Sequence, residues 1–98
     1  MPMPTWEIAI LRCIEQLGGT AELAQVYANI NRFKELLPHH LKASRYGGRP
    51  EYVHQVRRHI TNLCRHGDLT QTEPGSYAIT GKARSRLQET PVGPGNGY

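Results

Sequence analysis

Apolar side chains recur every three or four residues along much of the chain, the spacing of one face of an α-helix. The first such stretch predicts a helix over residues 6–17, which the Gly18-Gly19 pair would end. The second predicts a helix over residues 22–36. Pro38 would end it, because the residue before a proline is disfavoured in the helical conformation.

A third stretch predicts a helix over residues 51–66, with Pro50 in its first turn and Gly67 as its C-terminal cap. Between the second and third helices we expect a polar, basic surface loop over residues 38–49. The apolar positions of the third helix share one face. They are Tyr52, Val53, Val56, Ile60 and Leu63.

Two weakly alternating stretches, residues 68–72 and 76–80, flank the turn sequence Glu73-Pro74-Gly75 and predict a β-hairpin. Thr80 can cap a last short helix over residues 82–87. The order is helix, extended link, helix, loop, helix, hairpin, short helix. We therefore expect a mainly α fold with a small β-hairpin, the winged helix-turn-helix, in which the third helix enters the major groove of DNA.

The length of 98 residues predicts one small domain, residues 1–89, followed by a Pro/Gly-rich tail over 90–98 that we expect to be disordered. No apolar run approaches the roughly 20 residues that span a bilayer, and the start lacks the features of a secretory signal. We therefore expect a cytoplasmic protein, or a nuclear one in a eukaryote. Cys13 and Cys64 lie on apolar helix faces and are expected to be free, buried thiols.

Positive charge is concentrated in the middle of the chain. The net charge of +4 divides into −2 over residues 1–31, +6 over residues 32–66 and zero over residues 67–98. All five histidines also lie in the basic middle. This distribution favours a polyanionic partner, although many soluble proteins have a basic side.

The polar face of the third helix carries Gln55, Arg58, Asn62 and Arg65, spaced three, four and three residues apart. Arg can make paired hydrogen bonds to guanine, and Gln or Asn can make them to adenine. The face is therefore typical of a DNA-reading helix, and the alternative is a solvated face that happens to be basic. The wider DNA-binding set that we expect adds cationic and imidazole side chains of the helix and the preceding loop: His54, Arg57, His59, Lys42, Arg45 and Arg49.

The predicted loop and the predicted wing differ in charge. The loop cations Lys42, Arg45 and Arg49 suit sequence-independent phosphate contacts. The tip of the wing carries Glu73 and no cation, so we expect it to contribute little affinity for DNA.

Metal binding and catalysis have little support in the sequence. A closed zinc site needs four converging ligands, and no cysteine pair accompanies the His54–His59 spacing. No nucleophile or acid–base pair is recognisable, so we expect no enzyme activity, metal or cofactor. We expect Tyr27 and Tyr77 to belong to the core rather than to form stacking platforms.

Residues 10–21, 56–69 and 75–80, with Gly81 and Leu87, resemble the N-terminal winged-helix domain of Mrr-type restriction proteins. The resemblance covers the first helix with its Gly-Gly-x-Ala turn, the third helix with its Gly-x-Leu exit, and the wing. It implies a DNA-binding or DNA-sensing module, often joined to an effector, in a restriction, defence or regulatory system. Unlike proteins of that family, the 98 residues carry no Asp…Glu-x-Lys nuclease signature, and we expect them to form one domain.

The sequence thus predicts a module that binds duplex DNA through residues 51–66. The alternative is a winged-helix module that binds another protein through the same basic face. A homodimer through the first or last helix, residues 6–17 or 82–87, and a separate effector protein are further partners that remain open.

Overall fold

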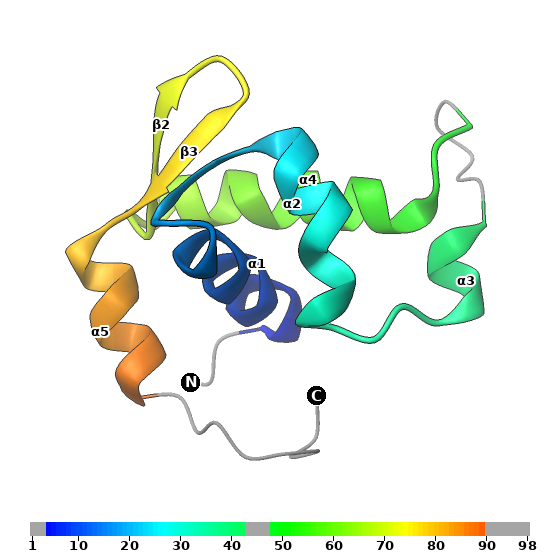
Figure 1. Cartoon of the computed structure of the whole chain (residues 1–98), viewed down its shortest axis with the longest axis horizontal. Helices are drawn as coiled ribbons and strands as arrows, with labels where there is room; N and C mark the ends of the chain where they lie inside the picture. The colour runs from blue at the N-terminus through cyan, green and yellow to red at the C-terminus, as the bar shows by residue number, and fades with distance from the viewer. Residues whose placement is uncertain (1–3, 43–47, 90–98) are drawn as a thin grey trace.

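The computed structural model of the protein describes residues 4–42 and 48–89. Arg45 and the expected tail lie outside these residues. The helices are α1 (Thr5–Gln16), α2 (Leu23–Asn29), the 3₁₀ turn η1 (Ile30–Arg32), α3 (Pro38–Leu41), α4 (Glu51–Arg65) and α5 (Gly81–Glu89). The strands are β1 (Thr20–Glu22), β2 (Leu69–Glu73) and β3 (Ser76–Ile79). The expected class, mainly helical with a small hairpin, is confirmed (Figure 1).

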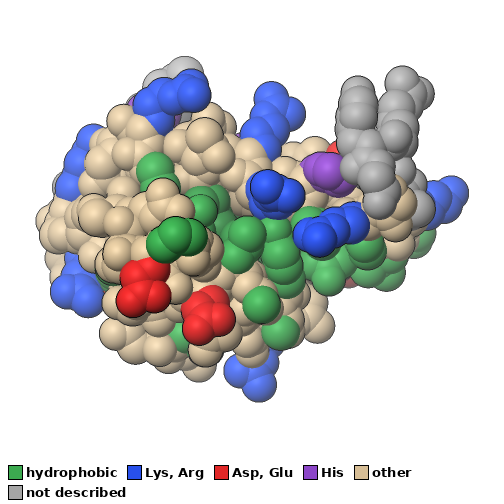
Figure 2. Space-filling model, turned by 90° about the horizontal axis from the view of Figure 1, so that it is seen from above, with side chains coloured by type: hydrophobic (Ala, Val, Ile, Leu, Met, Phe, Trp, Pro, Cys, Tyr) green, Lys and Arg blue, Asp and Glu red, His purple; other side chains and the backbone are tan. Residues whose placement is uncertain are grey.

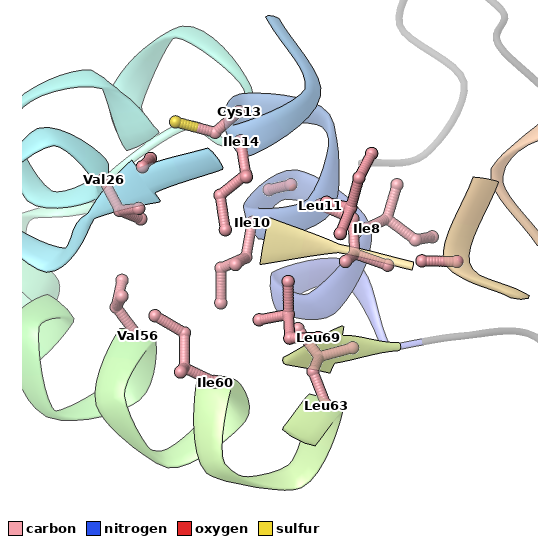
Figure 3. Close-up of a cluster of buried hydrophobic side chains, with 14 of the residues drawn as sticks. Ile8, Ile10, Leu11, Cys13, Ile14, Val26, Val56, Ile60, Leu63 and Leu69 are labelled. Carbon is pink, nitrogen blue, oxygen red and sulfur yellow. The ribbon is translucent and has the colours of Figure 1, made fainter. Parts of the chain in front are cut away.

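Helix α1 forms the centre of the core. The sequence predicted one apolar stripe, yet α1 is buried on most of its surface, because α2, α4, α5 and β3 all pack against it. A helix that is apolar nearly all round is expected in this position. Figure 3 shows Ile10 of α1 facing Val56 and Ile60 of α4. Within α1 only Glu15 and Gln16 are exposed, so residues 6–17 leave little surface for the dimer considered above.

The second helix is shorter than the hydrophobic pattern predicts. Instead of continuing to residue 36, α2 ends at Asn29 and passes into η1. The side-chain amide of Asn29 donates to the carbonyl oxygen of Gln25 at 2.8 Å, and so competes with the backbone for a helical acceptor. Apolar residues after the end of α2 still reach the core, since Ile30 is buried.

Pro38 begins a helical turn, α3, where the sequence predicted only a loop. Proline fits the first position of a helix because its φ is already helical and its missing N–H has no partner to lose there. The N–H of Leu37 donates to Nδ1 of His40 at 2.9 Å, so the side chain of His40 completes the cap. The first part of the expected loop is therefore ordered by its own sequence.

The three strands form an antiparallel sheet in the order β1-β3-β2. The hairpin of β2 and β3 turns at Gly75, whose φ is +81°, and its register shifts between Gln71 and Glu73. The expected extended link Thr20–Ala21, of the sort that can become a one-bridge strand, is part of β1, which pairs Thr20 with Ala78 of β3. The hairpin is thereby joined to the segment between α1 and α2.

A buried ion pair joins the start of the hairpin to α5. Asp68 is fully buried, and its carboxylate contacts the guanidinium group of Arg86. The backbone N–H of Thr80 donates to the carbonyl oxygen of Asp68 at 3.1 Å. The hydroxyl of Thr80 accepts from the N–H of Ala83 at 3.3 Å, which confirms Thr80 as the cap of α5.

Trp6, the single tryptophan, lies against α3. The edge-to-face contact between the rings of Trp6 and His40 has a centroid distance of 5.3 Å, and Nζ of Lys34 lies 4.8 Å from the centroid of Trp6. Burial lowers the pKa of His40, and the nearby charges of His39 and Lys34 lower it further, while Glu51 opposes this effect. The fold therefore favours the neutral imidazole.

We expect α3 to separate from Trp6 as the pH falls below the ordinary His pKa of 6.5. The pKa of His40 is lower in the fold, so the stabilisation is complete above pH 6.5 and is lost as the pH falls through the folded value. Protonation also places a hydrogen on Nδ1, which then cannot accept from Leu37. Trp6 fluorescence between pH 8 and about pH 4.5 measures the change.

Two variants control the acid titration. His39→Gln should keep the fluorescence transition, because the ring of His40 remains in place. His40→Gln should abolish it, because that side chain has no proton to gain. An unaltered transition in His40→Gln would assign the pH dependence to another group.

Candidate nucleic-acid interface

Helix α4 has well-defined ends. Pro50 is the residue before its first turn, one position earlier than the sequence predicted. At the other end Gly67 has a φ of +83°, a conformation that favours glycine. The N–H of Asp68 donates to the carbonyl oxygen of Leu63 at 2.9 Å, and that of Gly67 to Cys64 at 3.2 Å. These two bonds form the expected glycine C-terminal cap.

The fully exposed arc of α4 consists mainly of arginines. Arg57, Arg58 and Arg65 are exposed, and 3.6 residues per turn place them within an arc of about 100°. Thr61 lies inside this arc, and its hydroxyl donates to the carbonyl oxygen of Arg57 at 3.1 Å. Within residues 4–42 and 48–89 the ion pairs are His59–Glu7 and Arg86–Asp68, so the three guanidinium groups have no carboxylate partner there. Their charge faces solvent.

The predicted base readers divide into two groups. Arg58 and Arg65 are exposed, whereas Gln55 and Asn62 are half-buried. The amide nitrogen of Gln55 also donates to the carboxylate of Glu51 at 3.3 Å. The exposed arc is therefore displaced from the predicted one towards Arg57, and the two amides lie at its edge.

The imidazoles of α4 point partly inward. Nδ1 of His59 lies 2.9 Å from Oε2 of Glu7, and the two side chains are only 15% and 6% exposed. Because α1 covers this side of α4, His59 does not belong to the exposed arc. His54 is half-buried and is also engaged in an interaction.

Two of the predicted loop cations lie beside the first turn of α4. The N–H of Glu51 donates to the carbonyl oxygen of Lys42 at 2.9 Å, which brings Lys42 close to α4. Lys42 and Arg49 are both exposed. The third predicted cation, Arg45, lies outside the described residues.

Tyr27 of α2 is a polar group that the sequence assigned only to the core. Its ring packs against the core cluster, but its hydroxyl is buried and has no hydrogen-bond partner among the residues that the structure describes. Burial raises the pKa of Tyr27, while the positive charges of Arg57 and Arg49 lower it. The hydroxyl therefore lies within the electrostatic range of two exposed guanidinium groups.

Two exposed carboxylates lie near the tip of the hairpin. Glu22 and Glu73 are exposed, and the structure has a polar hollow between the hairpin and the start of α2. Figure 2 shows acidic side chains on the left of the molecule and Lys, Arg and His side chains beside a hydrophobic band further right. The hollow is lined by Thr20, Ala21, Glu22, Gln25, Thr72, Glu73 and Ser76.

Other kinds of site have little basis in the described residues. Cys13 is a buried free thiol, as predicted, whereas Cys64 is free but only half-buried, and burial raises the pKa of both. Residues 4–42 and 48–89 hold no group of three His, Cys, Asp or Glu side chains placed to bind a metal ion. None of the helices there has the length and apolar character to span a membrane.

No protein-family model, curated protein or solved structure matches the chain.

Proposed function

We propose that the chain is a DNA-binding module of the winged-helix type that contacts duplex phosphates through the arginines of α4. The observation that carries the proposal is the exposed arc of Arg57, Arg58 and Arg65, which has no carboxylate partner in the described residues. Guanidinium groups bind phosphate oxygens through paired, charged hydrogen bonds. An unpaired cluster of this kind attracts a polyanion.

The positions of the amides favour phosphate contacts over base reading. Gln55 and Asn62 are half-buried at the edge of the arc, so paired contacts to adenine would require them to turn outward. Arg58 and Arg65 remain available for guanine. We therefore propose binding that depends strongly on charge and weakly on sequence.

The arrangement of the hairpin supports a winged-helix mode of docking. Strand β2 packs against α4, so the hairpin lies next to the proposed DNA-binding helix. Its exposed Glu73 would repel phosphate, and the wing should add little affinity. The resemblance to Mrr-type restriction proteins is consistent with this mode. It extends the proposal to an attached effector in a restriction, defence or regulatory system, in the cytoplasm or the nucleus.

Fluorescence anisotropy with a labelled random duplex tests the proposed function. We expect log K to fall linearly with log salt, with a slope of about −3 to −5, because each phosphate contact contributes about −0.9. Duplexes of different sequence should bind with similar affinity. Absence of binding even at low salt, by a protein with a normal melting curve, would contradict the proposal.

The second candidate is a module that binds another protein. The sequence predicted such binding through the basic face, whereas the exposed pair Glu22 and Glu73 at the polar hollow favours the hairpin end. Carboxylates at this end would attract a basic segment of a partner protein, whereas they would repel the phosphates of DNA. Replacing both residues by Gln separates the two candidates. If the chain is a DNA-binding module, the double variant should bind duplex DNA as tightly as the wild type or more tightly. If it is a protein-binding module, the variant should lose affinity for the partner protein, and DNA should have no effect on that binding.

A further inference from the structure

The hydroxyl of Tyr27 is a buried donor that finds no acceptor among residues 4–42 and 48–89. It exposes almost no surface, and none of the described residues bonds to it. Buried polar groups are nearly always hydrogen-bonded, and leaving one unpaired is unfavourable. An unpaired donor therefore calls for an explanation, such as a ligand that supplies the missing acceptor.

The surroundings of this hydroxyl are cationic and aromatic. Arg49, which precedes α4, and Arg57, on α4, are the charges that act on Tyr27 most strongly. Tyr52 and Tyr77 complete the neighbourhood. Both arginines are exposed and unpaired within the described residues, so their flexible side chains can move while the ring of Tyr27 stays fixed in the core. Figure 2 shows cationic side chains bordering a hydrophobic band in the right half of the molecule.

We propose that Tyr27, Arg49 and Arg57 together bind one phosphate of the DNA backbone. The inference rests on the proposed function and gives it a defined contact that joins α2 to α4. A phosphate has a negative charge and oxygens that only accept hydrogen bonds. It therefore suits a site with one phenolic donor and two guanidinium groups, each of which can donate paired hydrogen bonds. Binding requires the side chains that cover the hydroxyl to move aside, so that the hydroxyl gains the phosphate as its acceptor.

Tyr27→Phe tests the inference because it removes the hydroxyl and no charge. In duplex anisotropy we expect affinity to fall about 10- to 100-fold, the usual cost of losing a hydrogen bond to a charged group. The salt slope should not change, since the number of displaced counterions is the same. Thermal stability should be unchanged or slightly higher, because the free protein loses only an unpaired buried donor. Tyr77→Phe is the matched control and should bind like the wild type.

A double-mutant cycle with Arg57→Gln tests whether both groups hold the same phosphate. Arg57→Gln alone should reduce the steepness of the salt slope by about 0.9. Adding Tyr27→Phe to it should then cost much less than in the wild-type background, because a shared contact makes the two losses non-additive.

The outcomes distinguish this inference from the proposed function. If the wild type binds duplex and Tyr27→Phe binds equally well, the phosphate contact is wrong and the proposed function stands. If Tyr27→Phe lowers the melting temperature and binds normally once folded, the hydroxyl is structural and the inference fails. If Tyr27→Phe weakens binding to an acidic protein and leaves duplex affinity unchanged, the ligand of this site is a carboxylate and the phosphate contact is wrong. If the wild type does not bind duplex, both proposals fail.

Discussion

Replacing Arg57, Arg58 and Arg65 together by Gln should lower duplex affinity on the order of 100-fold at low salt. The three side chains form the exposed arc of α4 and have no carboxylate partner in the described residues, so their full charge is available to DNA. Loss of three phosphate contacts should also reduce the steepness of the log–log salt slope by about 2.7. Anisotropy over a salt series measures both quantities.

A charge-matched variant controls for the change in net charge. Arg32 and Arg84 are exposed cations on η1 and α5, and replacing both by Gln removes the same charge as replacing Arg57 and Arg58 by Gln. This variant should retain most of the affinity, because charges beyond about 10 Å are largely screened at ordinary salt. Equal losses in the two variants would show that net charge, and not the arc on α4, determines binding.

Replacing Arg86 by Met should destabilise the protein by about 3–5 kcal/mol, because it leaves the carboxylate of Asp68 buried without its cation. Met retains much of the apolar stem, so the change tests mainly the charge. Urea denaturation followed by circular dichroism measures the free energy of unfolding. The same loss should loosen the hairpin, since Asp68 begins it and Arg86 lies on α5.

Arg84→Met is the matched control on the same helix. Arg84 is exposed, forms no ion pair with a described residue, and should change stability by less than about 0.5 kcal/mol. In an Asp68→Asn background Arg86→Met should cost much less, because no buried carboxylate then remains. An Arg86→Met protein as stable as Arg84→Met would show that the pair contributes nothing.

Local signals in the sequence predicted the ends of α4 and the start of α5 well. Gly67 ends α4 because its positive φ allows two capping bonds, and Thr80 begins α5 because its hydroxyl accepts from the third residue beyond it. These capping hydrogen bonds join residues three to five positions apart. The apolar stripe of α4 likewise follows from helical geometry alone, and its buried members are Val53, Val56, Ile60 and Leu63.

The end of α2 was harder to predict from the same kind of pattern. Apolar residues continue beyond Asn29 at helical spacing, and so the sequence predicted a longer helix. The helix passes into a 3₁₀ turn after Asn29, whose side chain donates to the carbonyl oxygen of Gln25, and Ile30 still reaches the core from that turn. Pro38 fits both the end of one helix and the start of another, and the contact of His40 with Trp6 favours the start.

The sequence by itself determined that α4 has a basic polar face opposite its apolar stripe, because helical periodicity assigns both faces. Only the tertiary structure decided which part of that face meets solvent. Helix α1 covers the side that carries His59, so the exposed arc moves towards Arg57. The burial of the Tyr27 hydroxyl and of the Asp68 carboxylate depends in the same way on distant segments. Spacing along the chain cannot reveal them, because burial and pairing arise only when separate elements pack together.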